Sequence, residues 1–323
     1  MASDRPALGV IIVTYRSADV IGACLASLRA ATGVALHVVV VDNASPDDTV
    51  EAIRAAVPDL MGAVQAGQEG IALIEAGTNG GFAAGVNLGL ARLAANPGLE
   101  RFWLLNPDCV VPPETPHLLA THDPGPKGAA MIAHRVVYGD DPDKIQIDGG
   151  VIDRRTGITR NLNQFAPATS PAPDPSRIDF VTGASLVATR AFVEQAGPMA
   201  EDYFLYYEEV DWALRRGELP ISFCEGAVVR HVAGTAIGSQ RMGSVASPFS
   251  QYFKHRARAM FLRRHFPTGL IGGAAWSLAK AAQLAANGYR AEAGALLRGF
   301  FGMGPPEQVL SALSPDARAK IGR

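Results

Sequence analysis

The sequence predicts an α/β protein with a doubly wound, mostly parallel sheet that carries helices on both faces. Three observations support this fold class. Apolar runs recur along the first 110 residues, each run ends in a short polar cluster, and helical stretches follow the clusters. Ligands in such folds bind beyond the carboxyl ends of the strands. The polar clusters therefore mark the expected site.

The first two strand-and-helix units are the clearest. Leu8 to Tyr15 forms the first expected strand and precedes a helical stretch around Ile21 to Ala30. The second strand contains Val38 to Val41, which is β-branched at every position and therefore suits a strand buried on both faces. Ser45 is expected to cap the next helix, which would open on a proline and two aspartates.

Ile71 to Glu75 and Arg101 to Leu105 are the third and fourth expected strands. A glycine-rich turn follows the third strand, where Gly80 and Gly81 would let the backbone approach an anion at a helix start. A plain glycine turn into a packed helix explains the same residues. The loop lacks the G-x-G-x-x-G spacing of dinucleotide sites and the Lys-Ser/Thr pair of a P-loop. A nucleotide other than NAD or ATP is therefore the better expectation.

The composition is that of a soluble, enzyme-sized chain. Its 323 residues are 48% hydrophobic, which suits one large domain with an appendage. A formal net charge of −2 gives no reason to expect a nucleic-acid partner. Cys24, Cys109 and Cys224 are widely spaced and fit a reducing compartment. The first residues lack a basic-then-apolar signal layout, so a cytoplasmic location is expected.

Basic and aromatic residues alternate from Phe249 onward, as in a basic amphipathic helix. Two interpretations are open: contact with a membrane surface or lipid phosphate, and packing on the sheet domain with a solvated basic face. The apolar stretch Leu270 to Leu284 is shorter than the roughly 20 residues that a membrane span needs. Helices beyond Gly269 would pack on the same chain or on a partner, so the oligomeric state is also left open by the sequence.

Three further positions carry side chains suited to chemistry. Asp108 follows the fourth strand, where it would bind Mg²⁺ or Mn²⁺ or simply form a turn. Glu208 and Glu209 open a helix beside an aromatic run. Partial desolvation would raise the pKa of such a carboxyl toward use as a general base, whereas the ordinary role is pairing with the helix dipole. His231 ends an expected strand, where it would be either a metal ligand or a structural histidine.

Six segments occur in a recognisable order: VVVDNAS, NGGFAAGVNLGL, LLNPDCVVPPE, TGASLVATRAF, YFLYYEEVDWALR and RHVAGTAIGS. As a set they resemble glycosyltransferase family 2, and in particular its bacterial rhamnosyltransferase-like branch. The resemblance runs from about Val10 to His265. It implies a GT-A fold, a nucleoside-diphosphate sugar donor, a divalent metal and inversion at the anomeric carbon.

The resemblance also implies roles for single residues. Thr14 and Tyr15 match contacts to the donor base and ribose, and Asp42 matches the acid that hydrogen-bonds the base. Asn106 stands where many relatives carry the first aspartate of D-x-D. The full set expected to bind the donor is Thr14, Tyr15, Asp42, Asn43, Ser45, Asn79, Gly80, Gly81, Phe82, Asn87 and Asn106.

Metal and base residues follow from the same resemblance. Asp108 matches the retained metal ligand, and His231 matches a histidine that completes the metal or diphosphate site, with Mg²⁺ or Mn²⁺ as the cation. Glu208 and Glu209 stand where many relatives have Glu-Asp, so Glu209 matches the catalytic base, one methylene longer. Metal and glycine-rich backbone would neutralise the leaving diphosphate while Glu209 deprotonates an acceptor hydroxyl. Asp211 and Arg215 match supporting positions.

The expected organisation is a GT-A domain over 1–245 and a C-terminal helical region over 246–323. Within the domain, a donor-binding half covers about 1–110 and an acceptor-side half about 111–245. The donor is expected to be a dTDP- or UDP-sugar, with rhamnose as the branch's sugar, and the acceptor a glycan or lipid-linked glycan in cell-surface polysaccharide or glycolipid synthesis. The proline-rich stretch 166–176 and the basic C-terminal region are expected to shape acceptor choice. With these acceptors, the protein is expected to make peripheral contact with the inner face of a membrane.

Two other classes remain open. A nucleotidyltransferase also combines an α/β sheet with metal-binding aspartates, but it needs a glycine-rich, basic first loop, whereas Thr14 to Ser17 holds one arginine and no glycine. A non-catalytic sugar-nucleotide or glycan-binding protein on a degenerate transferase fold is suggested by Asn106 and Glu209. Donor hydrolysis or transfer would separate an enzyme from such a protein.

Overall fold

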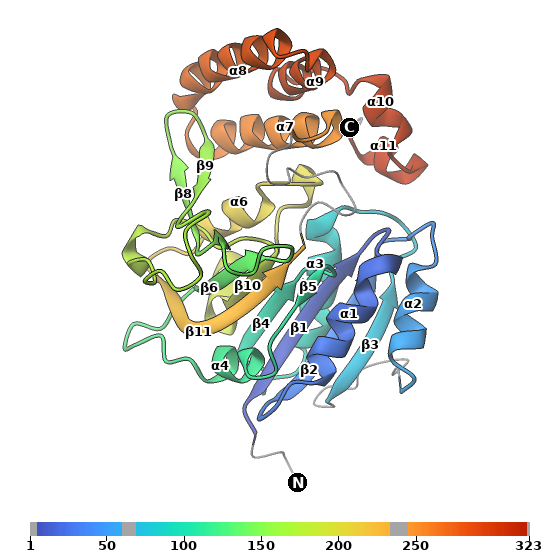
Figure 1. The fold of residues 1–323 in the computed structure, drawn as a ribbon, viewed down its shortest axis with the longest axis vertical. Helices are drawn as coiled ribbons and strands as arrows, with labels where there is room; N and C mark the ends of the chain where they lie inside the picture. Colours follow the sequence, from blue (N-terminus) through green and yellow to red (C-terminus); the bar gives the residue numbers. More distant parts are fainter. Residues whose placement is uncertain (1–4, 60–68, 233–244, 322–323) are drawn as a thin grey trace.

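The computed structural model describes residues 5–59, 69–232 and 245–321, and a central nine-stranded sheet organises the fold (Figure 1). The strands of this sheet are β1 (Ala7–Thr14), β2 (Ala35–Asp42), β3 (Gly70–Glu75), β4 (Arg101–Leu105), β5 (Cys109–Val110), β6 (Met131–Tyr138), β7 (Ile145–Ile147), β10 (Ser185–Thr189) and β11 (Ile221–His231). A separate hairpin consists of β8 (Gly150–Asp153) and β9 (Ile158–Asn161).

Helices cover both faces of the sheet, and the last five form a layer beyond one end of it (Figure 1). The helices are α1 (Ala18–Arg29), α2 (Thr49–Ala56), α3 (Phe82–Ala94), α4 (Thr115–Thr121), α5 (Arg190–Ala196), α6 (Glu208–Leu214), α7 (Pro248–His265), α8 (Gly269–Ala286), α9 (Arg290–Phe300), α10 (Glu307–Ser311) and α11 (Pro315–Ile321). Two short 3₁₀ helices are η1 (Pro175–Arg177) and η2 (Glu201–Tyr203).

The strand order is β3-β2-β1-β4-β10-β6-β11-β5, and β7 pairs with β6. The first four strands run parallel, which confirms the predicted βα units. β10 then runs antiparallel to both β4 and β6, so the second half of the sheet is mixed. In register, Thr14 pairs with Asp42, and Asp42 pairs with Glu75. The carboxyl ends of β1, β2 and β3 therefore form one edge, as predicted.

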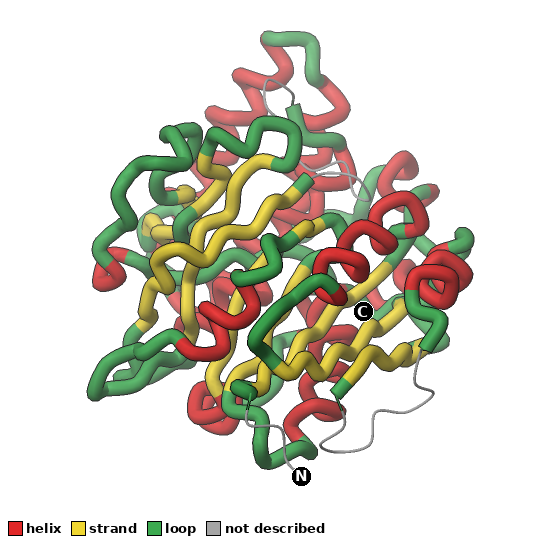
Figure 2. The backbone as a smooth tube through the Cα atoms, turned by 60° about the horizontal axis from the view of Figure 1, so that its bottom comes forward, coloured by secondary structure: helices red, strands yellow, loops and turns green. Residues whose placement is uncertain are grey.

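The core lies on both faces of the sheet, between the two helix layers (Figure 2). Along β2 the side chains alternate: Val39 and Val41 pack with α3 and α6, whereas Val38 and Val40 pack with α1 and α2. All four are almost fully buried. The β-branched run is thus a strand buried on both faces, as predicted.

One helix start differs from the prediction. Helix α2 begins at Thr49 after an Asp48 N-cap, so Ser45 does not cap it. The Ser45 hydroxyl donates instead to Asp42 Oδ1 (2.6 Å), and the Ser45 backbone N–H donates to Asp42 Oδ2 (2.9 Å). The Ser45 oxygen accepts from the Arg16 backbone N–H (3.1 Å) and not from the first turn of α2, so the side chain serves the strand end and not the helix start.

The basic helix α7 is packed against the protein. Its aromatic residues Tyr252, Phe253 and Phe261 are buried, and so is Arg258, whose guanidinium lies between the rings of Trp276 (4.6 Å) and Phe300 (4.7 Å). The packing interpretation therefore accounts for the alternation of basic and aromatic residues. Among the described residues, no helix is long and apolar enough to cross a membrane.

A buried carboxylate joins α6 to α7. Asp211 Oδ1 accepts hydrogen bonds from Tyr203 Oη (3.2 Å), Arg264 Nη1 (3.1 Å) and His265 Nε2 (2.7 Å). Its Oδ2 is ion-paired with Arg215 (3.2 Å). Burial by itself would raise the pKa of Asp211, but the hydrogen bonds from His265 and Arg264 and the nearby positive charges hold that pKa below its usual value. Asp211 thereby fixes α6 relative to the C-terminal layer.

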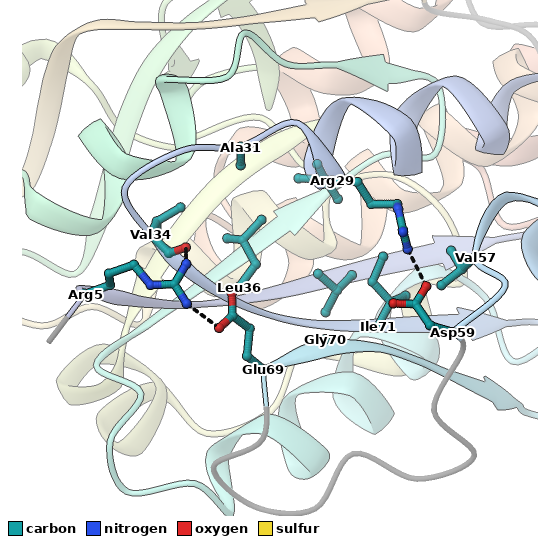
Figure 3. Close-up of a pocket in the computed structure, with 12 residues that line it drawn as sticks. Arg5, Arg29, Ala31, Val34, Leu36, Val57, Asp59, Glu69, Gly70 and Ile71 are labelled. Carbon is teal, nitrogen blue, oxygen red and sulfur yellow. Dashed lines mark hydrogen bonds and ion pairs between the residues drawn. The ribbon is translucent and has the colours of Figure 1, made fainter. Parts of the chain in front are cut away.

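A shallow hollow of about 340 Å³ lies at the amino-terminal edge of the sheet, away from the polar clusters (Figure 3). Two ion pairs border it, Arg5 with Glu69 (2.6 Å) and Arg29 with Asp59 (2.5 Å). Leu36, Val38 and Ile71 add aliphatic side chains to a lining that is mostly polar.

Helix α3 packs closely on β1 through glycine, and this predicts an unusual mutational effect. A Cβ on Gly89 would lie 2.6 Å from Ile11 Cγ2. We expect Gly89→Ala to lower the free energy of unfolding by about 1–3 kcal/mol, although alanine favours helix more than glycine does. At Gly294 in α9, where a Cβ would meet open space, the same change should raise it by up to about 1 kcal/mol. Urea denaturation measures both; equal stabilisation at the two sites would contradict the close packing.

Loss of the Asp211 carboxylate should uncouple α6 from α7. We expect Asp211→Asn to lower the free energy of unfolding by about 3 kcal/mol at pH 7, because Arg215 and Arg264 lose the buried carboxylate with which they pair. A depressed pKa stabilises the fold above the unfolded-state value of about 3.9, and this contribution is lost as pH falls through the folded-state pKa. The difference between wild type and variant should therefore shrink below about pH 4.

Asp202→Asn is the matched control for this prediction, since Asp202 pairs with Arg264 (2.7 Å) at the surface. It should cost no more than about 1 kcal/mol. Urea denaturation at several pH values gives these quantities, and an Asp211→Asn cost that does not change with pH would contradict the assignment.

Candidate active site at the carboxyl edge of the sheet

Asp42, at the end of β2, is held by its neighbours on two strands. Asp42 Oδ1 accepts hydrogen bonds from Thr14 Oγ1 (2.9 Å) and Ser45 Oγ, and Oδ2 accepts one from the Ser45 backbone. A carboxylate has about four acceptor positions, so capacity for a further hydrogen bond remains. The backbone N–H of Arg16 donates to Ser45 Oγ (3.1 Å), which ties the loop after β1, including Tyr15, to the same group.

The glycine-rich loop before α3 adopts a conformation that only glycine suits. Gly81 has φ +86°, and a Cβ there would lie 2.4 Å from the carbonyl oxygen of Phe204. Its N–H donates to Asn79 Oδ1 (3.0 Å), and its carbonyl accepts from Asn43 Nδ2 (3.0 Å). The Phe82 N–H donates to Phe204 O (3.2 Å). The loop is thus in direct contact with the segment that leads to Glu208 and Glu209.

Asn87, expected in the donor set, has its amide group engaged by the protein. Its Nδ2 donates to the carbonyl of Met199 (3.0 Å) and to Glu201 Oε1 (3.0 Å), and its Oδ1 accepts from the Met199 N–H (2.8 Å). These contacts join α3 to the segment around η2, which leads on to Phe204.

Asp108 and His231 meet at the other end of the edge, where β5 pairs with β11. His231 Nε2 lies 3.2 Å from Asp108 Oδ1 and 3.4 Å from Asn106 Nδ2. His231 Nδ1 lies 2.7 Å from the amide oxygen of Gln146, so we assign the imidazole proton to Nδ1. The lone pair of Nε2 then accepts from the Asn106 amide and faces the Asp108 carboxylate.

This donor set fits a divalent cation. A carboxylate oxygen and an imidazole nitrogen that face each other are both electron donors, and a cation between them would satisfy both. The Gln146 contact orients the imidazole in the way that metal-bound histidines usually require. Cys109 Sγ also lies within 4.8 Å of these atoms. Burial, with the charge of Asp108, raises the pKa of this thiol well above its usual value, and its Sγ donates to Ala184 O (3.4 Å). Cys109 is therefore a buried thiol that bonds to the chain beside the two facing groups.

Glu208 and Glu209 both have raised pKa values. Burial is the main cause for Glu209, opposed by backbone N–H groups, among them that of Gly183, and by the charge of Lys254. For Glu208, which is 4% exposed, burial and then the charge of Glu209 raise the pKa further. Among the described residues, Glu208 Oε2 has no hydrogen-bond partner. Raised carboxyl pKa values are typical of general acids and bases.

Gly183 connects the glycine-rich loop with Glu209. A Cβ on Gly183 would lie 3.5 Å from Phe82 Cε1 and 3.8 Å from Glu209 Cδ. Gly183 therefore lies beside both of these expected functional side chains. The sequence analysis did not single out Gly183, although it lies in the recognised segment TGASLVATRAF. Gln146 was also missed, and no motif surrounds it.

The residues before Glu208 are strained. Phe204, Tyr206 and Tyr207 have φ of 68°, 70° and 67°, in the left-handed region that bulky side chains avoid. Tyr207 Oη donates to Gly157 O (2.6 Å) and Tyr206 Oη donates to Ser250 Oγ (2.9 Å), which holds the strained backbone in place. Strain of this kind concentrates at functional sites.

The structure thus brings the expected residues together in two groups along one edge. One group consists of Asp42, Thr14, Ser45 and the loop 79–87, with Glu209 near the loop. Asp108, His231 and Asn106 form the other. In the segment RHVAGTAIGS, residues 233–239 lie outside the described residues.

Comparison with known proteins agrees with this geometry. The family described as "Glycosyl transferase family 2" matches residues 9–181. The low-salt glycan biosynthesis hexosyltransferase Agl10 of Haloferax volcanii is 24% identical over 239 residues, which cover 73% of this chain and 70% of that protein.

Two solved structures are also similar. The mannosyltransferase PcManGT from Pyrobaculum calidifontis, in complex with GDP-Man and Mn²⁺, has a TM-score of 0.53 at 16% identity and covers 99% of this chain and 84% of its own. GalNAc-T7 with UDP, GalNAc and Mn²⁺ has a TM-score of 0.54 at 12% identity, and the match spans 81% of this chain and 48% of that protein. At these identities the likeness concerns the fold, which is GT-A. With the family match over more than half of its length, the chain belongs to glycosyltransferase family 2.

Proposed function

We propose that this chain transfers a sugar, with inversion, from a nucleoside-diphosphate sugar to a hydroxyl group of a glycan. The observation that carries the proposal is the contact between the glycine-rich loop and the base segment. Gly81 touches Phe204, and Gly183 lies between Phe82 and Glu209. A donor held by this loop would have its sugar within reach of the Glu209 carboxylate.

In this proposal Asp42 binds the donor base through its remaining acceptor capacity, supported by Thr14 and Ser45. The loop before α3 directs backbone N–H groups toward the diphosphate. A cation held by Asp108 and His231 would, when bound, neutralise charge that develops on the leaving diphosphate. These groups act on charge that grows in the transition state, and such stabilisation is usually the largest single contribution to rate.

Glu209 takes the acceptor proton. The acceptor oxygen forms a bond to the anomeric carbon as the bond from that carbon to the diphosphate oxygen breaks, and the diphosphate leaves with the electron pair. The proton passes to Glu209, which must be ionised beforehand. Its raised pKa makes the ionised carboxylate a better proton acceptor than that of an exposed glutamate.

Several finer features belong to the proposal. Rhamnose, carried on dTDP or UDP, is the donor sugar that the sequence motifs favour. The names of the similar proteins, which include GDP-Man and UDP complexes, support testing GDP as well. A glycan acceptor is supported by the glycan biosynthesis role printed for Agl10. Peripheral membrane contact would use exposed apolar side chains such as Ile271 and Leu278 of α8, because Tyr252, Phe253 and Phe261 of α7 are buried.

Removing the proposed base should stop transfer without preventing donor binding. We expect Glu209→Gln to lower kcat by about 10²–10⁴-fold, while the dissociation constant for the nucleotide stays within a few-fold of wild type. In the wild type, kcat/KM should rise with pH as Glu209 loses its proton, because only the carboxylate accepts one. The midpoint of this rise should lie at a pH above the usual glutamate pKa. The residual activity of the variant should not show the rise.

Steady-state sugar transfer measured from pH 4 to 9 tests this, with the exposed Glu218→Gln as control. Full activity of Glu209→Gln would remove Glu209 from the role of base. If Glu208→Gln loses transfer and Glu209→Gln keeps it, the base would be Glu208.

Asp108 should make nucleotide binding metal-dependent. We expect UDP, dTDP or GDP to raise the Tm of the wild type more with Mn²⁺ than without it, because a ligand at 100 times its Kd stabilises by about 2.7 kcal/mol. In Asp108→Asn the Mn²⁺-dependent part of the shift should disappear. The exposed Asp140→Asn serves as control. A panel with no shift for any nucleotide, with or without Mn²⁺, would contradict the proposal and favour a glycan-binding protein on a transferase fold.

A further inference from the structure

The last helix of the described chain reaches the glycine-rich loop. Lys320, on α11, lies with its Nζ 2.6 Å from the carbonyl oxygen of Gly80 and 3.4 Å from Glu201 Oε2. The two contacts join residues separated by 240 and 119 positions in the sequence. The side chain is 32% exposed, so its ammonium group is partly shielded from water.

Apolar packing brings α11 to this position. Val309, Leu313 and Ala317 are buried in one cluster with Phe204 and Phe253. Phe204 is the residue whose carbonyl accepts from the Phe82 N–H. The end of the chain therefore packs on the same segment that contacts the loop, and Lys320 extends from there to Gly80.

Glu201 extends the connection to the helix that follows the loop. Its Oε2 pairs with Lys320, and its Oε1 accepts from Asn87 Nδ2 (3.0 Å). Lys320 thus contacts the loop directly at Gly80 and indirectly at Asn87. The stretch between these two residues is held at both ends by groups outside it.

We propose that Lys320 is a positioning residue of the donor site, through which α10 and α11 hold the loop 79–87 in its donor-binding conformation. The inference rests on the proposed function, since it assigns the loop to the donor. Gly80 and Gly81 lose more conformational freedom on ordering than other residues do. A loop already ordered by Lys320 avoids that cost when the donor binds, which strengthens binding through preorganisation.

A stabilising surface ion pair would behave differently. Exposed pairs contribute little to stability and nothing specific to a ligand. The partner at 2.6 Å here is a backbone carbonyl of the loop itself, so loss of the ammonium should act on loop order rather than on the whole fold. The expected signature is weaker donor binding with unchanged kcat, because Lys320 contacts the loop and not Glu209.

Lys320→Met tests this in the full chain. Lys280→Met is the matched control, since Lys280 Nζ donates to Gln283 Oε1 of its own helix (2.9 Å) in an exposed hydrogen bond. The first readout uses no ligand: amide hydrogen exchange of the peptides covering 79–87. We expect faster exchange in Lys320→Met, unchanged exchange in Lys280→Met, and little change in Tm for either. Unchanged exchange in Lys320→Met would overturn the inference.

The second readout is calorimetric binding of UDP, dTDP and GDP with Mn²⁺, followed by kinetics with whichever sugar donor is active. We expect Kd and the donor KM to rise about 5-fold to 30-fold in Lys320→Met, the cost of ordering one backbone residue, with kcat within a factor of two. Lys320→Arg, which keeps a charged donor, should recover most of the loss. If the wild type binds nucleotide and Lys320→Met binds it equally well, the inference is wrong and the proposed function stands. If the wild type binds none, both fail.

Discussion

The close approach of Gly81 to the carbonyl of Phe204 is the constraint on which the arrangement of the site depends. It brings the loop before α3 and the segment before α6 to within a distance that excludes any Cβ. These two segments carry the groups expected to hold the donor and to accept the proton. Their separation is therefore set by backbone contact, which is stiffer than a contact between two long side chains. A site that must align three reacting atoms benefits from such stiffness, because small displacements weaken catalysis strongly.

Holding these segments together has an energetic cost that the rest of the molecule offsets. Three bulky residues in the left-handed region cost of order 1–3 kcal/mol each. Buried groups surround them: the tyrosine hydroxyls bond to the β8–β9 hairpin and α7, and Asp211 fixes α6 through four partners. The C-terminal helices are thus a structural support for the strained segment. This explains why α7 combines aromatic residues with arginines although it is not an isolated amphipathic helix.

The sequence was sufficient to predict the parallel half of the sheet, because β-branched runs and the polar residues after them depend only on local pattern. It also predicts roles for Asp42, Asp108, Glu209 and His231, whose motifs are contiguous, and these roles stay predictions. The Ser45 cap was wrong, because the Ser45 side chain bonds to the strand-end carboxylate of Asp42 and to the Arg16 backbone, and α2 begins only at Thr49. Gln146 and Lys320 could not be predicted. Each acts through a contact between residues at least 85 positions apart, which the packing of the whole chain determines and no local pattern reports.

Asn106 and Glu209 were the two departures that suggested a degenerate site, and their surroundings argue otherwise. The Asn106 amide approaches His231 Nε2 while Gln146 accepts from Nδ1, so both contacts favour the imidazole tautomer that leaves a lone pair toward Asp108. An aspartate at 106 would place a second negative charge there but could not donate this hydrogen bond. At Glu209, the longer side chain lies beside Gly183, whose backbone N–H bonds the carboxylate. Each departure is matched by a neighbour that compensates for it, which is the pattern expected of a site under functional constraint.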